Sequence, residues 1–283
     1  MKLPIYIPTL GRDRVYLLEQ LEDHLHAQVT LVTNRAQLPA LQAKYPRVNV
    51  VACPWTREPG QPKADGIKFG IAPTRQWMAE HAYRKGNRYL LMSDDDLCIY
   101  VRRNRKDLTD WHARRATSAE VTVALKDMER LTESEKKYAV VGMSAKQGNN
   151  RHTERTSEAK RIWNFWAVDV FRMHQLKIRM DAVPVMEDFW VQLNFLTRGW
   201  PTIQINDFMH CQGKSNAPGG CSLFRTNAHQ EAATKKLIEH FPDFIKPRKV
   251  KTKHGWFGEE RTDVTFYGKK ALEFGMYEGG ALL

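Results

Sequence analysis

Three consecutive aspartates follow an apolar segment of the chain. Residues 88–93 read RYLLMS, which is typical of a buried strand, and Asp94, Asp95 and Asp96 come directly after them. Adjacent carboxylates repel one another and lose hydration energy when they are buried. An acidic surface turn is the simple alternative, but the apolar YLLM in front of the aspartates disfavours it. We therefore interpret them as a functional group of carboxylates at the end of a core strand.

These three carboxylates have the chemistry of a metal site. Alternation along a strand would send Asp94 and Asp96 to one side and Asp95 to the other. Two hard oxygen donors on one side suit Mg²⁺ or Mn²⁺, which keep coordination positions for water and phosphate. A dication would also relieve the repulsion and let all three carboxylates stay ionised.

A second acidic pair, Glu187 and Asp188, begins an apolar segment with helical periodicity that stops at Gly199. A carboxylate in this place could act as a general base towards a hydroxyl group. Neighbouring helical positions point about 100° apart, so only one of the two could face a given reacting atom. The simpler alternative is that both residues only balance the helix dipole.

The order of the expected elements places the aspartates in an α/β domain. Strands are predicted at 3–8, 28–34, 48–54 and 88–93, and helices at 15–25, 36–45 and 71–87. Strands that alternate with helices over 100 residues predict a mostly parallel sheet with helices on both faces. In such sheets ligands bind beyond the carboxyl ends of the strands, which is where the three aspartates fall.

The second half of the chain is more mixed. We predict helices at about 117–136, from 185 to Gly199 and at 228–241, and strands at 138–145, 161–171 and 202–210. The polar and glycine-bearing stretches at 55–70, 146–160 and 211–227 are expected to be loops.

The chain is strongly basic. Its 44 Lys and Arg residues against 32 Asp and Glu give a formal charge of +12, with basic runs at 102–106 and 246–254. Such an excess indicates a polyanionic partner, either nucleic acid or a phosphate-bearing substrate. A solubilising surface would explain either run alone, but two runs favour nucleic acid.

Targeting and cysteine signals suggest a reducing compartment. The apolar runs are too short for a membrane span, and Pro4 and Pro8 interrupt any signal-peptide core, so we expect a cytoplasmic protein with no membrane partner. The four cysteines form no CxxC pair and are expected to be reduced thiols. A zinc site could be composed from four side chains, but their spacing matches no zinc pattern; they are His210, Cys211, Cys221 and His229.

Taken together, the motifs resemble those of GT-A-fold glycosyltransferases, in which an acidic D-x-D motif after a strand holds a divalent metal bound to a nucleotide sugar. PTLGR at 8–12 resembles the end of the first strand in that family, which touches the nucleobase and ribose. IAPTR at 71–75 resembles a segment with an arginine near the nucleotide, and VMEDFW at 185–190 resembles the motif that supplies the base. His210 corresponds to a C-terminal histidine that completes the metal shell.

The resemblance implies a division of the chain and a role for each motif residue. It covers 1–215, with a nucleotide-sugar half at 1–100 and an acceptor half at 101–215, and leaves 216–283 as a basic extension on the same domain. Asp188 would be the base, with Glu187 as the alternative, and a single base implies inversion, although retention stays open. The metal, Mn²⁺ or Mg²⁺, would be held by Asp94, Asp96 and His210, and the donor by Pro8, Thr9, Arg12, Arg75, Asp94 and Asp95.

Two of these roles have plain alternatives. Arg75 could be an ordinary arginine on a helix surface. His210 could be a strand-end histidine satisfied by the backbone.

A narrower resemblance concerns the acceptor. The high charge, the PTLGR start and the SDDD core resemble the phage TET-associated glycosyltransferases, which implies transfer from a UDP-sugar to the hydroxyl of 5-hydroxymethylcytosine in DNA, in the host cytoplasm. Such an enzyme would flip the base, and Trp163, Phe165 and Trp166 offer stacking surfaces, some of which belong to the core. The alternatives are a polysaccharide or protein acceptor, or a non-catalytic nucleic-acid-binding protein. The oligomeric state stays open, with a monomer favoured.

Overall fold

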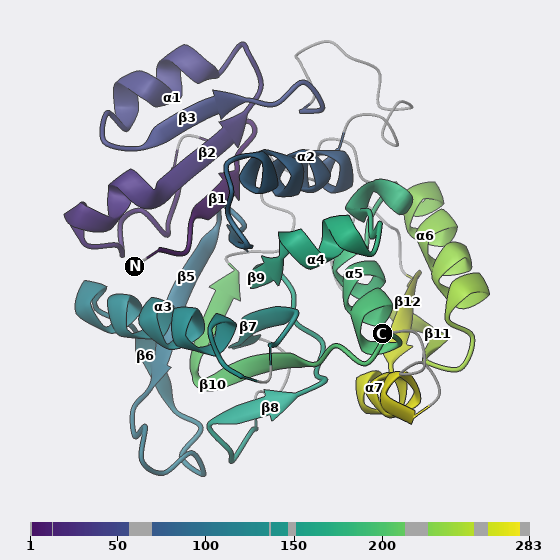
Figure 1. The fold of residues 1–283 in the computed structure, drawn as a ribbon. Coiled ribbons are helices and arrows are strands. Elements are labelled where there is room, and N and C mark those ends of the chain that lie inside the picture. Colours follow the sequence, from purple (N-terminus) through teal and green to yellow (C-terminus); the bar gives the residue numbers. More distant parts are fainter. Residues whose placement is uncertain are drawn as a thin grey trace.

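A mixed sheet of ten strands lies at the centre of the molecule (Figure 1). The computed structural model describes residues 2–12, 14–56, 70–135, 137–146, 151–212, 226–251 and 260–277. The strands of this sheet are β1 (Ile5–Pro8), β2 (Val29–Thr33), β3 (Asn49–Ala52), β4 (Tyr89–Ser93), β5 (Leu97–Arg102), β6 (Ala113–Arg115), β7 (Val140–Ala145), β8 (Thr156–Glu158), β9 (Phe165–Asp169) and β10 (Thr202–Gln212). Their order is β3-β2-β1-β4-β9-β7-β10-β5-β6, and β8 pairs with β10.

The N-terminal part of this sheet is parallel. β3, β2, β1 and β4 run in one direction, and β7 is parallel to β10. β9 is inserted antiparallel between β4 and β7, while β5 is antiparallel to β10 and β6. The predicted α/β class is thus confirmed. The carboxyl ends of β1 and β4 meet at one edge of the sheet, which is where ligands bind in such folds.

The sheet separates two hydrophobic cores, because side chains alternate along its strands. Tyr6 of β1 belongs to one core, while its neighbours Ile5 and Ile7 belong to the other. Helices α2 (Ile71–Arg84), α4 (Val170–Gln175) and α5 (Glu187–Leu196) cover the first core. Helices α1 (Leu38–Lys44) and α3 (Ser118–Thr132) cover the second. The expected coverage of both faces is therefore confirmed.

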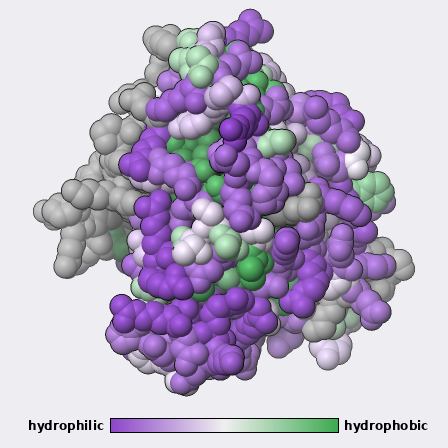
Figure 2. Space-filling model, turned by 90° about the vertical axis from the view of Figure 1, so that its left-hand side faces the viewer, coloured by the Kyte–Doolittle hydropathy of each residue, from purple (hydrophilic) through white to green (hydrophobic). Residues whose placement is uncertain are grey.

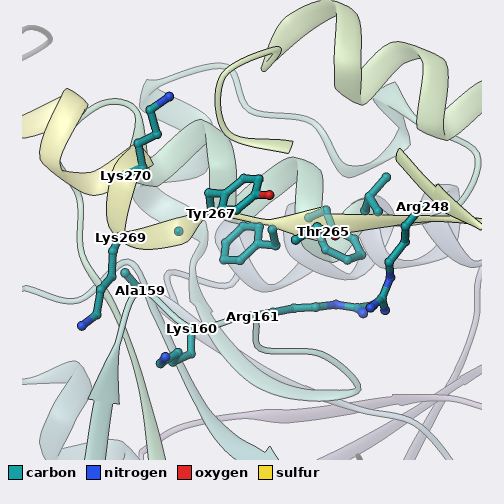
Figure 3. Close-up of a pocket in the computed structure, with 12 residues that line it drawn as sticks. Ala159, Lys160, Arg161, Arg248, Thr265, Tyr267, Lys269 and Lys270 are labelled. Carbon is teal, nitrogen blue, oxygen red and sulfur yellow. The ribbon is translucent and has the colours of Figure 1, made fainter. Parts of the chain in front are cut away.

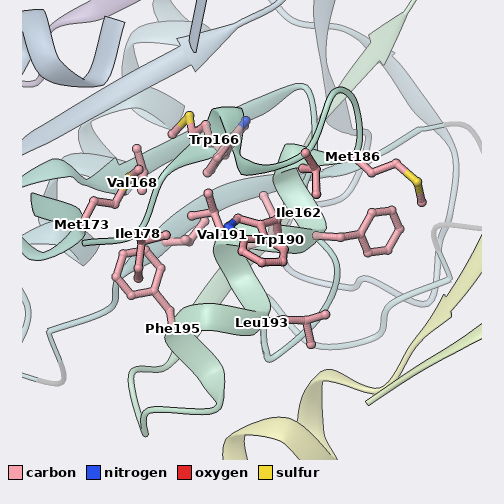
Figure 4. Close-up of a cluster of buried hydrophobic side chains, with 14 of the residues drawn as sticks. Ile162, Trp166, Val168, Met173, Ile178, Met186, Trp190, Val191, Leu193 and Phe195 are labelled. Atoms are coloured by element: carbon pink, nitrogen blue, oxygen red, sulfur yellow. The ribbon is translucent and has the colours of Figure 1, made fainter. Parts of the chain in front are cut away.

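Helix α5 is the most deeply buried helix of the described part of the chain, since all ten of its residues are buried. Val191 and Phe195 pack in the same cluster as side chains from β9 and α4 (Figure 4), whereas the Trp190 ring meets Phe241, directly after Asn227–His240, with ring centroids 5.5 Å apart. A helix enclosed on all sides fixes its own first residues rigidly, and those residues are Glu187 and Asp188.

The C-terminal residues pack against α5. They form α6 (Asn227–His240), a hairpin of β11 (Ile245–Lys251) and β12 (Glu260–Phe266), and α7 (Gly268–Tyr277) (Figure 1). Leu237, Phe244 and Val264 belong to the same core cluster as Phe189. A Cβ atom at Gly275 would overlap the Leu196 carbonyl, so the close approach of α7 to the end of α5 depends on a glycine.

Two segments next to the acidic turn differ from the sequence-based expectation. The helix expected at 15–25 consists of turns followed by a short 3₁₀ helix, Asp23–Gln28. The Tyr16 N–H donates to the Asp95 carbonyl at 3.1 Å, and the Gln20 side chain bonds the backbone of β5, so tertiary contacts replace helical ones. Strand β5, directly after the aspartates, was not predicted.

The described residues also bear on membrane insertion and cysteines. No helix within the described ranges combines the length and hydropathy that crossing a membrane requires. Cys53, Cys98 and Cys211 are free thiols as predicted, while Cys221 lies outside the described ranges.

The face that bears α1 and α3 is mostly hydrophilic (Figure 2).

Candidate active site

Asp94, Asp95 and Asp96 form the turn between β4 and β5. Arg12, which follows β1, pairs with Asp95 at 3.0 Å and with Asp96 at 3.1 Å. Asp94 instead pairs with Arg75. The expected separation of Asp95 from Asp96 by strand alternation is not seen, since both contact Arg12, because β4 ends at Ser93 and the turn has no strand period.

The residues expected to bind the donor lie at the same edge of the sheet. Pro8 ends β1, and Thr9 is buried and donates its N–H to the Val32 carbonyl at 2.9 Å. Because β1 and β4 are parallel neighbours, their carboxyl ends bring Thr9 and Arg12 beside the acidic turn.

Arg75 connects the two acidic groups that the sequence singled out. It lies in the first turns of α2, is only 4 % exposed, and forms ion pairs with Asp94 and Glu187. Its role as a surface arginine is thereby excluded. Since one guanidinium joins the turn after β4 to the first residue of α5, the two motifs form a single site.

The strained backbone of one residue sets the orientation of Glu187 and Asp188. Met186, which caps α5, has a φ of 65°, in the left-handed region that non-glycine residues rarely adopt. Its sulfur accepts a hydrogen bond from Gln230 of α6 at 3.3 Å. The chain therefore turns sharply into α5 and buries both carboxylates.

The two carboxylates point in different directions, as expected for adjacent helical positions. Glu187 faces Arg75, towards the acidic turn. Asp188 faces Arg161, whose Nε and Nη2 both lie 3.3 Å from its Oδ2. Arg161 also lies 3.9 Å above the Phe189 ring and 4.7 Å from the Trp163 ring.

Carboxyl groups outnumber guanidinium groups in this cluster. Among the residues that the structure describes, five carboxyl groups lie with three guanidinium groups, so full ionisation would leave two negative charges unmatched; these groups are Asp94, Asp95, Asp96, Glu187 and Asp188 with Arg12, Arg75 and Arg161. Burial raises the pKa of Asp94 to about 6 and that of Asp95 to about 7, against the opposing arginines. Burial also raises the pKa of Asp188, although Arg161 counteracts it.

The metal ligands inferred from the resemblance do not all come together. Within the described ranges, no three His, Cys, Asp or Glu side chains are grouped so that they could hold a metal ion. His210 is fully buried on β10, opposite Ile99 of β5, and burial lowers its pKa to about 3. Neither of its ring nitrogens has a hydrogen-bond partner among the described residues, so the described backbone does not satisfy this side chain.

Gln212 takes the place beside the aspartates that was expected for His210. Its amide nitrogen lies 3.1 Å from Asp96 Oδ2, and its amide oxygen lies 3.5 Å from the Asn164 side chain. Gln212 and His210 are two residues apart on one strand and so share a side of the sheet. The predicted strand ends at 210, whereas β10 continues to Gln212. Extending the two-residue period of the strand beyond His210 could have identified Gln212 as a residue of the site.

Gln192 was also missed, and it holds the segment that carries Arg161. Its fully buried side chain donates to the Ile162 carbonyl at 2.6 Å and accepts from the Ile162 N–H at 3.0 Å. It also donates to the Asp188 carbonyl at 2.8 Å. The hydrogen-bonding of Gln192 therefore fixes Arg161 and Trp163 next to the start of α5.

One of the three expected stacking aromatics lies at the site. Phe165 and Trp166 are fully buried in β9, in opposite cores. Trp163 precedes the strand, is partly exposed, and contacts Arg161 and, in a T-shaped arrangement, the His210 ring. Trp163 is thus the aromatic residue of this group that a ligand could reach.

The two basic runs have different environments. Arg102 is buried, and Arg105 pairs with the buried Asp207 at 2.8 Å, so part of the 102–106 run is structural. This run follows the far end of β5, six residues from the acidic turn. Of the 246–254 run, residues 246–251 form β11, and residues 252–254 lie outside the described ranges.

Similar solved structures are distant in sequence. A mannose-1-phosphate geranyltransferase from Thermus thermophilus matches 74% of this chain and 76% of that chain, at a TM-score of 0.45 and 11% identity. The protein A197 from STIV matches 80% of this chain and 92% of that chain, at a TM-score of 0.38 and 12% identity.

Sequence comparisons point to phage proteins and to one family. The beta-glucosyl-HMC-alpha-glucosyl-transferases of Enterobacteria phages T2 and T6 are each 29% identical over 80 residues, a stretch that spans 28% of this chain and 28% of each relative. The model of the TET-associated glycosyltransferases matches residues 3–220, which is most of the chain and includes both acidic motifs. The resemblance noted in the sequence is therefore confirmed, and the chain belongs to the TET-associated glycosyltransferase family.

Proposed function

We propose that this glycosyltransferase moves a sugar from a nucleotide sugar, most simply a UDP-sugar, to the hydroxyl of 5-hydroxymethylcytosine in DNA. The partly similar phage proteins are named beta-glucosyl-HMC-alpha-glucosyl-transferases, which supports an acceptor that contains HMC. The charge of +12 supports it independently, because DNA is a polyanion.

The single observation that carries the proposal is the bridge made by Arg75 between Asp94 and Glu187. Sugar transfer needs a site for the anionic leaving group next to a base for the acceptor. The acidic turn and the start of α5 lie on the two sides of this bridge. We assign the turn to the donor and the start of α5 to the catalytic base.

The donor would lie at the carboxyl ends of β1 and β4. Thr9 and Arg12 reach this edge from β1, and Arg75 reaches it from α2. Guanidinium groups bind phosphate oxygens with paired, charge-assisted hydrogen bonds. Arg12 and Arg75 would exchange part of their contact with the aspartates for the donor diphosphate.

The carboxylates of the acidic turn are better candidate ligands for a divalent cation than His210 is. A dication would balance the two excess negative charges that full ionisation of the cluster leaves, and the hard oxygens of Asp94 and Asp96 are the ligands that Mn²⁺ and Mg²⁺ prefer. Asp94 and Asp96 would hold the metal, and His210 would not. Such an ion stabilises the charge that develops on a leaving diphosphate.

Asp188 is the proposed base, because it faces away from the donor turn while Glu187 faces towards it. The acceptor oxygen forms a bond to the anomeric carbon as the bond from that carbon to the diphosphate oxygen breaks. The electron pair leaves with the nucleoside diphosphate, and Asp188 takes the hydroxyl proton. A single base opposite the leaving group gives an inverted product.

The reacting base has to leave the DNA stack to reach Asp188. Arg161 contacts both Asp188 and Trp163, and the partly exposed Trp163 is the proposed stacking surface for the flipped base. Stacking of a base on an aromatic side chain stabilises such complexes by about 1–3 kcal/mol.

The proposal is tested by nucleoside diphosphate release. The enzyme is incubated with a panel of nucleotide sugars and a duplex that contains 5-hydroxymethylcytosine, with the same duplex containing 5-methylcytosine as control. We expect release only with the hydroxymethylated duplex. Release that requires a polysaccharide or protein acceptor would contradict the DNA assignment. DNA binding without any thermal shift from nucleotide sugars would indicate a non-catalytic protein.

A further inference from the structure

A basic pocket of about 530 Å³ lies beside the start of α5 (Figure 3). It is formed by the segment before β9, the hairpin strands β11 and β12, and the first turn of α7. Pockets of this size accommodate small ligands or parts of larger ones. The sequence drew attention to the basic tail but not to this pocket, because its walls come from segments that are far apart in the chain.

The lining of the pocket is cationic. Lys160, Arg161, Arg248, Lys269 and Lys270 line it together with aromatic side chains, and no acidic residue lines it among those that the structure describes. Arg161 pairs with Asp188 at 3.3 Å, and Arg248 pairs with Asp263 at 3.6 Å. The three lysines are exposed and form no ion pair with any residue that the structure describes. Such a concave cluster of positive charge attracts anions.

The pocket has a rigid frame. A Cβ atom at Gly268 would overlap the Ala159 carbonyl, so the segment that carries Lys160 lies directly against the start of α7. Phe189 and Phe266 meet edge to face below, with ring centroids 5.9 Å apart. The lysines therefore project from fixed backbone, and Lys269 and Lys270 occupy the first turn of a helix, whose dipole also favours anions.

The position of the pocket decides which anion it binds. Arg161 lines the pocket and also contacts Asp188, and Phe189 is the next residue of α5. The donor side of the cluster, in contrast, consists of Arg12, Arg75 and the acidic turn, none of which lines the pocket. The pocket is therefore on the acceptor side of the proposed base.

We propose that this pocket binds the phosphodiester backbone of the acceptor strand next to the nucleotide that receives the sugar. The inference rests on the proposed function and adds to it the residues that hold the DNA. Lys160, Lys269 and Lys270 contact phosphate oxygens, and Arg161 connects this contact to Asp188. The main DNA-binding surface is thus the wall of the pocket and not the run at 102–106.

The test compares two variants with the same change in charge. K160A/K269A/K270A removes the pocket lysines, and R103A/K106A/K126A removes three exposed cations from the loop after β5 and from α3. Binding of a fluorescent hydroxymethylated duplex is measured over a range of salt concentrations, and UDP binding is measured by calorimetry. Melting temperatures show whether both variants fold. If K160A/K269A/K270A does not fold, K160Q/K269Q/K270Q replaces it.

The pocket variant should bind DNA on the order of tenfold more weakly at low salt, or worse. Its log–log salt slope should be shallower by about 2–3 units, because each lost phosphate contact contributes about 0.9. The control variant should keep a slope close to that of the wild type, and UDP affinity should not change in either.

Equal slopes in both variants would overturn the inference, since only overall charge would then matter. Weaker UDP binding with unchanged DNA binding would also overturn it, by assigning the pocket to the donor phosphates. The inference would also be overturned if the wild-type protein did not bind DNA at low salt. If DNA binding depends on the pocket but no sugar reaches hydroxymethylated DNA, the proposed reaction fails and the pocket assignment stands.

Discussion

Asp188 accepts two hydrogen bonds from Arg161, both at 3.3 Å, through a single carboxylate oxygen. The second oxygen of the carboxylate does not take part in this contact. The ion pair keeps a buried carboxylate oriented and opposes the rise in pKa that burial causes. Since Arg161 also lines the basic pocket, an acceptor bound there would lie next to the proposed base.

Replacing Asp188 with asparagine should remove the base while it keeps the shape of the side chain. We expect kcat to fall by about 100-fold or more, because general-base catalysis contributes that much. UDP affinity should stay at the wild-type value. The matched control is Glu187→Gln, which alters the donor side. If Glu187→Gln loses turnover and Asp188→Asn does not, the base is Glu187.

The pH dependence of kcat should report the environment of Asp188. A base works only when deprotonated, so activity is lost as the pH falls through its pKa. Because burial raises that pKa, the loss should occur above about 3.9, the usual value for aspartate. Arg161→Gln removes the charge that lowers the pKa and should move the inflection to higher pH. Arg161→Lys should move it less, and identical inflections in all three proteins would exclude Asp188 as the titrating base.

Asp96→Ala should abolish transfer, with a loss of about 100-fold or more, if a cation at the acidic turn stabilises the leaving group. EDTA should have the same effect on the wild type, and Mn²⁺ should restore activity. Mn²⁺ should also raise the melting temperature of the wild type but not of Asp96→Ala, which is a readout independent of activity. Full turnover in EDTA would contradict the metal site.

Gln192→Met should destabilise the protein, because it leaves the buried N–H and carbonyl of Ile162 without their partner. Each unsatisfied buried group costs about 1–3 kcal/mol, so the loss should be about 2 kcal/mol or more. A drop in melting temperature of about 4 °C or more is expected for a chain of this size. Gln42→Met makes the same change at an exposed position of α1 and should have little effect. Equal shifts in the two variants would refute the structural role of Gln192.

The parts of the fold with a clear period were predictable from the sequence. Strands β1 to β4 and helices α2 and α5 lie close to their expected positions, since their apolar residues repeat with the period of a strand or a helix. The same period identified Glu187 and Asp188 as the start of a helix. The contacts of the acidic turn were not predictable, because a turn has no period and its partners come from β1 and α2.

The candidate site contained further residues that lack a local signal. Arg161 and Gln192 act through contacts across about 30 residues of chain, which hydropathy does not encode. His210 was chosen by family resemblance, whereas the structure places its neighbour Gln212 against Asp96. The basic pocket combines Lys160 with Lys269, and only tertiary structure brings these residues together.

The mass of the nucleosides in treated DNA tests the central claim most directly. DNA containing 5-hydroxymethylcytosine is incubated with the enzyme and a panel of nucleotide sugars, digested to nucleosides and weighed by mass spectrometry. We predict that one or more donors add the mass of a sugar residue to the hydroxymethylcytosine nucleoside alone, and that Asp188→Asn leaves it unmodified. Unmodified hydroxymethylcytosine with every donor, or sugar on unmodified cytosine as well, would contradict the account.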